Sequence, residues 1–220
     1  MEARGGDLKL SKTIYGTHRS PLYAGAAVSD NDSKFTKTQV SLKKDHQWTA
    51  TAGFRIAALD RGAIRFEFAQ DWICIPDEDS VKFYDSEPPA DNCRLAVSRQ
   101  SFSDGADRLS LDDLVIAITR DDPRGLRRTT ELNHVRRPAM ELVWLEFQFT
   151  DPTLKYEART RFCLARGAGV YALVTFDFWQ EDHEKFIPLW DHVLETLTLG
   201  EFILDPTSGA RVQRNNPQTG

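Results

Sequence analysis

Residues 140–179 read MELVWLEFQFTDPTLKYEARTRFCLARGAGVYALVTFDFW, and their alternation of apolar and polar side chains decides the fold. A period of two is typical of half-buried strands, and three such runs occupy residues 140–149, 156–166 and 170–179. Asp151-Pro152 marks the first turn, and Gly167-Ala168-Gly169 forms the second because glycine supplies positive φ. The stretch therefore predicts an antiparallel meander with one apolar face.

The same alternation predicts which side chains share a face of the sheet. We expect Trp144 and Trp179 to point away from the face that holds Phe147 and Phe176. Cys163 falls on the arginine-bearing side of its strand, which predicts that its thiol is partly exposed. No histidine lies close to Cys163 in the sequence, so nothing favours it as a nucleophile.

Two amphipathic helices flank the meander in the sequence. In the first, at residues 111–119, Ser110 is the expected N-cap and Asp113 completes a variant capping box. The second covers residues 181–197, where Pro188 either kinks the helix or lies in the first turn of a shorter one. Its apolar residues at helical spacing predict a buried stripe: Phe186, Leu189, Trp190, Val193, Leu194 and Leu197.

Shorter strand-like runs at residues 63–68, 73–76, 81–83 and 93–102 precede the first helix. The sequence therefore predicts one α+β domain at residues 51–204. Residues 1–50 are polar and are expected to form a flexible N-terminal tail, although 34–50 could include a short strand. Residues 205–220 are expected to form a second tail.

Composition excludes several classes of protein. The chain has 220 residues, a net charge of −5 and a pI near 5.6, so it lacks the basic footprint of a nucleic-acid binder. No apolar run is long enough to span a membrane, and no signal peptide is visible, which predicts a cytoplasmic protein. The three cysteines have no metal-binding or paired spacing and are expected to be reduced. No cofactor motif occurs.

The order of elements resembles a known superfamily. A W-x-x-x-P segment at Trp72 precedes a small helix, an R-x-R-F strand from Arg159, the run VYALVTF, and a closing helix that ends in D-x-V-L-x-T-L-x-L at Leu199. Over residues 54–200 this pattern is similar to the PsbP/DcrB-like α/β/α sandwich, in its uncharacterised bacterial branch. The resemblance implies an antiparallel sheet of about six strands flanked by helices.

The resemblance also implies a class of function. Members of this superfamily share no enzyme activity and mostly bind other proteins, and some cytosolic relatives are chaperones that hold an apolar helix of a secreted effector. We therefore expect a non-enzymatic protein-binding or assembly module without a cofactor, whose partner is another protein. The chaperone role and a small-ligand enzyme remain alternatives, and the sequence does not indicate the oligomeric state.

Five residues are candidates for contacting that partner: Trp72, Trp144, Trp179, Arg136 and Arg137. Tryptophan is enriched in binding hot spots, and arginine can hold carboxylates or phosphates with two hydrogen bonds. Each has a structural alternative, since the terminal helix could cover the tryptophans. The arginines could instead protect a hairpin edge from aggregation.

Overall fold

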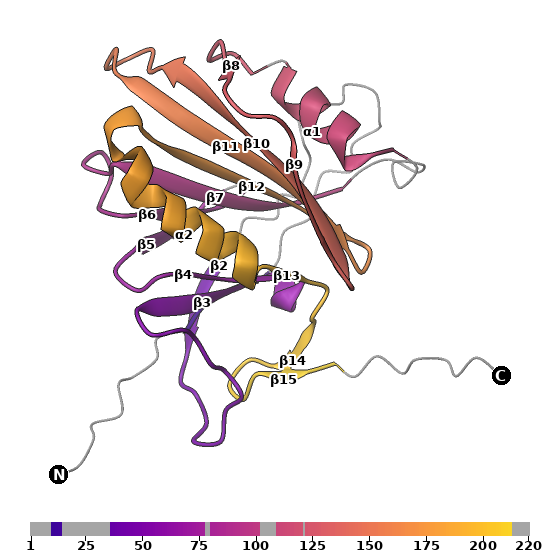
Figure 1. Cartoon of the computed structure of the whole chain (residues 1–220). Helices are drawn as coiled ribbons and strands as arrows, with labels where there is room; N and C mark the ends of the chain where they lie inside the picture. The colour runs from indigo at the N-terminus through magenta and orange to yellow at the C-terminus, as the bar shows by residue number, and fades with distance from the viewer. Residues whose placement is uncertain (1–9, 15–35, 78–79, 102–108, 121, 213–220) are drawn as a thin grey trace, which may run out of the picture.

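The computed structural model describes residues 10–14, 36–77, 80–101, 109–120 and 122–212. Its main sheet has eight strands in the order β5-β6-β7-β12-β11-β10-β8, and β9 also pairs with β10 (Figure 1). These strands are β5 (Ile73–Pro76), β6 (Val81–Tyr84), β7 (Cys93–Gln100), β8 (Arg127–Arg128), β9 (Asn133–Arg137), β10 (Met140–Thr150), β11 (Glu157–Gly167) and β12 (Val170–Trp179).

A smaller sheet has five strands in the order β13-β4-β3-β1-β2. Only the pairing of β1 with β3 is parallel among the described strands. The elements of this sheet and the remaining hairpin are β1 (Leu10–Ile14), β2 (Thr36–Val40), β3 (Phe54–Leu59), β4 (Ile64–Ala69), β13 (Thr198–Leu199), β14 (Ile203–Asp205) and β15 (Ala210–Arg211). Short 3₁₀ turns occupy Asp60–Gly62 and Gln180–Asp182.

The predicted meander is confirmed as strands β10, β11 and β12, each paired antiparallel with the next. Their register places Phe147 opposite Thr160, and Thr160 opposite Asp177. The fold class is therefore the expected α+β class with helices on both faces, although the main sheet has more strands than the six expected. None of the described helices is long and apolar enough to cross a membrane.

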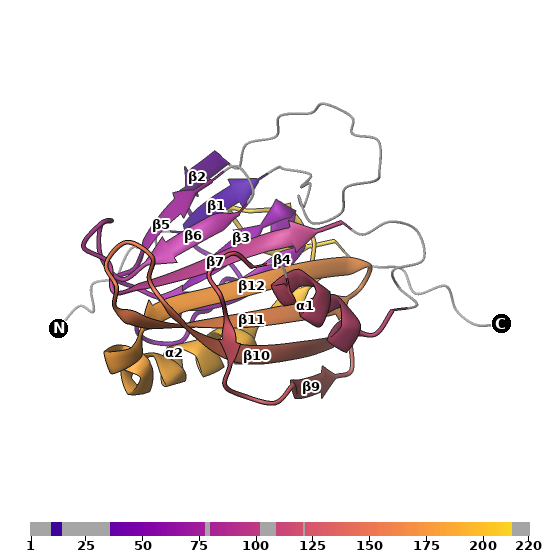
Figure 2. The ribbon, with the colours of Figure 1, turned by 90° about the horizontal axis from the view of Figure 1, so that it is seen from above.

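Helix α1 (Leu111–Arg120) covers one face of the main sheet (Figure 2). Leu114 and Val115 are buried there against Leu145 of β10 and other apolar side chains of β10 and β11. The predicted N-cap is confirmed, because the hydroxyl of Ser110 accepts the backbone N–H of Asp113 at 3.1 Å. That hydroxyl also donates to the Asp113 carboxylate at 2.6 Å, which fixes the first turn.

Helix α2 (His183–Thr196) and the smaller sheet cover the opposite face of the main sheet. The largest core lies between these two elements and the main sheet. Trp190 is fully buried and stacks on Phe176 of β12 at 6.0 Å between ring centroids. Pro188 lies inside this helix, so no shorter helix begins near residue 186. Cys163 also faces this core and is 0% exposed. The expectation of a partly exposed thiol was therefore wrong, because α2 covers the arginine-bearing side of β11.

A third apolar cluster lies on the smaller sheet, where Trp48 packs with Ile56, Ala58 and Ile203. The indole N–H of Trp48 donates to the backbone carbonyl of Pro206 at 2.9 Å. These contacts join residues 42–50 to the β14–β15 hairpin, and both segments reach beyond the expected domain limits of 51 and 204. Residues 1–9, 15–35 and 213–220 of the expected tails lie outside the described residues.

Candidate functional site

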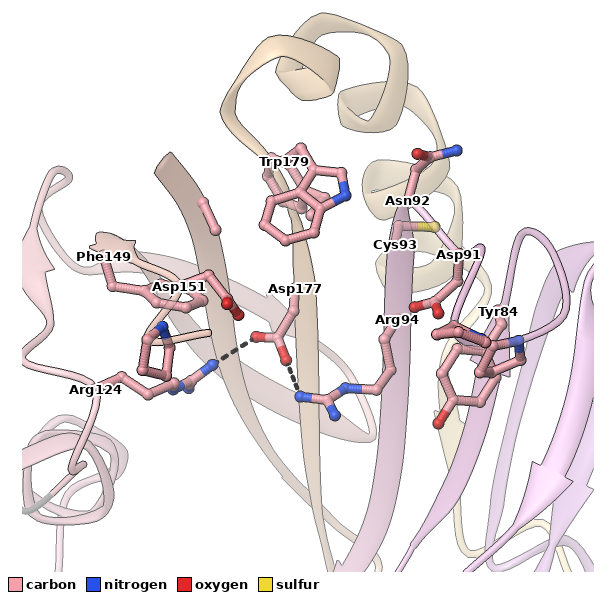
Figure 3. Close-up of a pocket in the computed structure, with 15 residues that line it drawn as sticks. Tyr84, Asp91, Asn92, Cys93, Arg94, Arg124, Phe149, Asp151, Asp177 and Trp179 are labelled. Carbon is pink, nitrogen blue, oxygen red and sulfur yellow. Dashed lines mark hydrogen bonds and ion pairs between the residues drawn. The ribbon is translucent and has the colours of Figure 1, made fainter. Parts of the chain in front are cut away.

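A hollow of about 440 Å³ opens at the end of the main sheet where β7 begins and β10 and β12 end (Figure 3). The loop that joins β6 to β7 closes one side, and the segment after α1 closes the other. Its principal side chains come from four parts of the chain: Tyr84, Arg94, Arg124, Phe149, Asp177 and Trp179.

Asp177 of β12 lies at the floor of this hollow between two arginines (Figure 3). Arg124 donates from Nη1 to one carboxylate oxygen at 2.9 Å, and Arg94 donates from Nη2 to the other. Arg124 also donates two hydrogen bonds of 2.9 Å, from Nε and Nη2, to the two carboxylate oxygens of Asp122. Its guanidinium lies 4.7 Å from the ring centre of Phe149. The four charged groups thus form a chain of alternating charge in the order Arg94, Asp177, Arg124 and Asp122.

The network fixes the protonation states at the floor. Burial alone would raise the pKa of the Asp177 carboxyl, but the charges of Arg124 and Arg94 outweigh burial and hold that pKa below its usual range. Burial alone would lower the pKa of the Arg124 guanidinium. Its hydrogen bonds to the carboxylates of Asp122 and Asp177 outweigh burial and raise that pKa. Cys93 lines the same hollow, and burial raises the pKa of its thiol. None of these three groups is poised to exchange a proton near neutral pH.

Hydrogen bonds hold the loop that closes the hollow. The Asp85 carboxylate accepts the backbone N–H groups of Asn92 at 2.8 Å and Cys93 at 3.2 Å. The hydroxyl of Ser86 donates to the carbonyl of Ala90 at 2.6 Å. Because these bonds span the loop, the residues between them have a defined position at the rim of the hollow.

A second hollow, of about 740 Å³, adjoins the first. The two share Pro89, Asp91, Asn92 and Trp179 in their linings, so they lie side by side, and together they are here called the Trp179 groove. Tyr156 meets Trp179 edge to face at 6.1 Å between ring centroids. Tyr156 is 65% exposed and Leu154 is 55% exposed, whereas Trp179 is half-buried.

The turn between β10 and β11 presents Leu154 and Tyr156 to the groove. The Asp151 carboxylate accepts the N–H groups of Thr153 at 2.8 Å and Leu154 at 2.7 Å, and the Asp151 N–H donates to the carbonyl of Tyr156. Asp151 therefore closes the turn from both sides, as aspartate does in many turns. The exposed apolar side chains lie on a fixed support.

The structure separates the sequence-predicted tryptophans. Trp72 is only 4% exposed and packs on Phe176 in the core. Trp144 is half-buried beneath α2, with its ring centroid 5.9 Å from that of Trp190. Trp179 lies on the other face of the sheet, at the groove. The expectation that Trp179 points away from the face of Phe147 was wrong, because the register places both on one face.

The predicted arginines lie elsewhere. Arg137 donates to the carbonyls of Leu194 at 2.7 Å and Leu197 at 3.1 Å, so it caps the end of α2. Arg136 is exposed and lines a shallow hollow on the β9–β10 hairpin. The nearby His134 pairs with Asp112 of α1 at 2.9 Å. The five candidate residues therefore do not form one site.

Sequence reasoning did not find the Arg94–Asp177–Arg124 network or the exposed Tyr156. Arg94 and Asp177 face each other only because of the pairing of β7 with β12, which separate strand patterns do not reveal. Among the described residues, no cluster of three or more histidine, cysteine or acidic side chains is arranged to hold a metal ion.

Residues 55–203 match the model of the Alr1449 family. The chain belongs to the Alr1449 family. It is 38% identical over 178 residues to the uncharacterized protein alr1449 of Nostoc sp. (strain PCC 7120 / SAG 25.82 / UTEX 2576), across 80% of this chain and 93% of that protein. All residues of the Trp179 groove lie within the part that matches the Alr1449 family model.

Solved structures of low sequence identity also resemble this Alr1449 family member. The cyanobacterial PsbP protein CyanoP of Synechocystis sp. PCC 6803 has a TM-score of 0.49 and 12% identity, over 69% of this chain and 95% of that one. LpqN of Mycobacterium tuberculosis, described as involved in cell envelope biogenesis, has a TM-score of 0.43 and 9% identity, over 62% and 82%. PsbP, which the sequence pattern resembles, is thus among these neighbours.

Proposed function

We propose that this protein is a non-enzymatic protein-binding or assembly module that docks a segment of another protein in the Trp179 groove. The observation that carries the proposal is the exposure of Tyr156 and Leu154 beside Trp179 on a hydrogen-bonded support. Water-exposed aromatic side chains that are already held in position lose little conformational entropy on binding, which makes them effective anchors.

A small-ligand enzyme is the less favoured alternative. The hollow has the size of a ligand site, but general acid–base catalysis needs a group that can exchange a proton near neutral pH. The Asp177 carboxylate is committed to two arginines, and the Cys93 thiol is held protonated by burial. The groups at the floor of the groove are therefore suited to building the fold and the docking surface.

A chaperone for an apolar helix of a secreted effector is the other alternative. Its setting would be the cytoplasm, which suits three buried free cysteines because reducing compartments preserve thiols. A long apolar helix, however, needs a continuous apolar channel, whereas Asp91, Glu157 and Glu181 line the second hollow together with its aromatic residues. This mixed lining favours a short amphipathic segment over an apolar helix.

Site-specific photocrosslinking in the native cell tests the proposal. A photoreactive phenylalanine analogue replaces Tyr156, and the same analogue replaces Leu204 as the control, because Leu204 is 73% exposed and does not line the groove. We expect a discrete protein adduct at position 156, absent at position 204 and lost when Trp179→Ala is added. Equal adducts at both positions, or an adduct that survives Trp179→Ala, would contradict the proposal.

A further inference from the structure

We infer that the segment docked in the Trp179 groove is positively charged, with lysine or arginine residues placed around one apolar anchor. This inference deepens the proposed function and rests on it. Its basis is the distribution of formal charge around the exposed aromatic residues.

Four acidic side chains line the groove without a lysine, arginine or histidine ion-pair partner among the described residues: Asp91, Asp151, Glu157 and Glu181. The contacts of two of them are with neutral groups. Glu157 accepts from Gln148 at 2.9 Å and from Thr150 at 2.8 Å, and Asp151 accepts backbone N–H groups of its own turn. Among the described residues, no lysine, arginine or histidine forms an ion pair with these four carboxylates.

The basic side chains that line the groove do not offset this charge. They are Arg94, which is paired with Asp177, and Arg124, which is paired with both Asp177 and Asp122. That network has two positive and two negative formal charges. Lys155 lies in the neighbouring turn, where its ammonium group donates to the carbonyl of Pro152 at 2.6 Å, and it is not part of the lining.

A basic segment matches this arrangement in two ways. Lysine or arginine side chains would form charge-assisted hydrogen bonds with the rim carboxylates, whereas a negatively charged partner would be repelled. A cation can also lie over the ring of an exposed tyrosine or tryptophan, while an apolar side chain fills the space between Tyr156, Leu154 and Trp179. Nucleic acids and anionic membranes are disfavoured by the same charges.

Selection from a random-peptide display library on the intact protein tests the inference. We expect the enriched peptides to carry an excess of lysine and arginine and at least one large apolar residue. A fluorescent synthetic copy of the most enriched peptide then reports affinity by anisotropy at low and high salt. Enrichment of neutral or acidic peptides, or no enrichment, would overturn the inference.

Isosteric variants separate the role of charge from that of the aromatic anchor. The triple variant Asp91→Asn, Glu157→Gln, Glu181→Gln is expected to weaken binding of that peptide about tenfold or more and to reduce its salt dependence. Glu195→Gln is the matched control, since Glu195 is exposed on α2 and does not line the groove. Thermal unfolding checks that each variant is folded.

The outcomes distinguish the two proposals. If Trp179→Ala abolishes binding and the triple variant binds like the parent, the groove is a docking site but the charge inference is wrong. If neither change affects binding, the proposed function fails as well. A concentration-dependent dimer in light scattering, abolished by Trp179→Ala, would identify a second copy of this chain as the occupant and would overturn the inference of a separate basic partner.

Discussion

Arg161 of β11 donates from Nε to the Glu146 carboxylate of β10 at 2.7 Å, and both residues are buried beneath α2. Arg159 supplies a second hydrogen bond to the same carboxylate. The guanidinium of Arg161 also lies 5.3 Å from the ring centre of Trp144 and 5.7 Å from that of Trp190. A charged pair therefore joins two strands of the main sheet inside an aromatic enclosure.

Removing one member of this pair should be strongly destabilising. Glu146→Ala leaves the Arg161 guanidinium buried without its main partner, and we expect the free energy of unfolding to fall by about 3–5 kcal/mol. The control is Glu141→Ala, whose carboxylate and partner Arg166 are both only partly buried, so we expect a loss of at most about 1 kcal/mol. Urea unfolding measures both, and equal losses would show that burial does not govern the contribution of the pair.

The buried carboxylates should also make stability depend on pH in the acid range. Burial opposes ionisation of Glu146, but Arg161 and Arg159 outweigh it and hold its pKa below the usual range, and the pKa of Asp177 is lowered in the same sense. A depressed pKa in the folded state contributes stability that is present above the unfolded pKa of about 4 and lost as pH falls through the folded value.

We therefore expect the urea midpoint to be nearly constant from pH 7 to about pH 5 and to fall progressively below it. In Glu146→Gln the slope below pH 5 should be shallower, because one of the linked protons no longer binds on unfolding. If the urea midpoint of Glu146→Gln falls with pH as steeply as that of the parent, ionisation of Glu146 does not contribute to the acid sensitivity.

The N-cap of α1 offers a local test. Ser110→Ala removes the acceptor for the Asp113 N–H and should lower the free energy of unfolding by about 1 kcal/mol. Ser110→Thr keeps a hydroxyl that can accept from the Asp113 N–H and donate to the Asp113 carboxylate, so it should retain most of the stability. If the alanine and threonine variants unfold at the same urea concentration, capping by this side chain contributes nothing measurable.

Two glycines with nearly the same positive φ separate torsional strain from steric overlap. Gly53 has φ of 84° and Gly62 has φ of 86°, but a Cβ at Gly53 would meet open space, whereas at Gly62 it would lie 2.6 Å from the carbonyl oxygen of Glu201. Gly53→Ala should cost about 1 kcal/mol from its left-handed conformation alone. Gly62→Ala should cost clearly more, and similar melting temperatures for the two variants would refute the proposed overlap.

Much of the fold could be predicted because its signals are local. The alternation in residues 140–179, the Ser110 cap and the apolar stripe of α2 all lie within single elements. The faces of the sheet were harder, since they depend on how the turns set the register between strands. Phe147 and Trp179 illustrate this, because each alternates correctly within its own strand and only the pairings through β11 place them on one face.

The candidate site was less predictable than the fold. Trp179 was identified from its residue type, but its neighbours come from the β6–β7 loop, the segment after α1 and the turn at residues 151–156. The polar side of β11 was also misleading, because charged residues usually indicate exposure. Here that face lies under α2, where Arg161 is paired with Glu146 and Cys163 is fully buried.

The contact between Trp48 and the β14–β15 hairpin has a practical consequence for anyone who shortens this protein. A fragment cut to residues 55–203, the region that the family shares, would lack both Trp48 and the carbonyl of Pro206 that its indole binds. Ile56 and Ala58 would then lose the residues that shield them from water on that side of the smaller sheet. Such a fragment should be prone to aggregation during purification, and retaining residues 36–212 should prevent it.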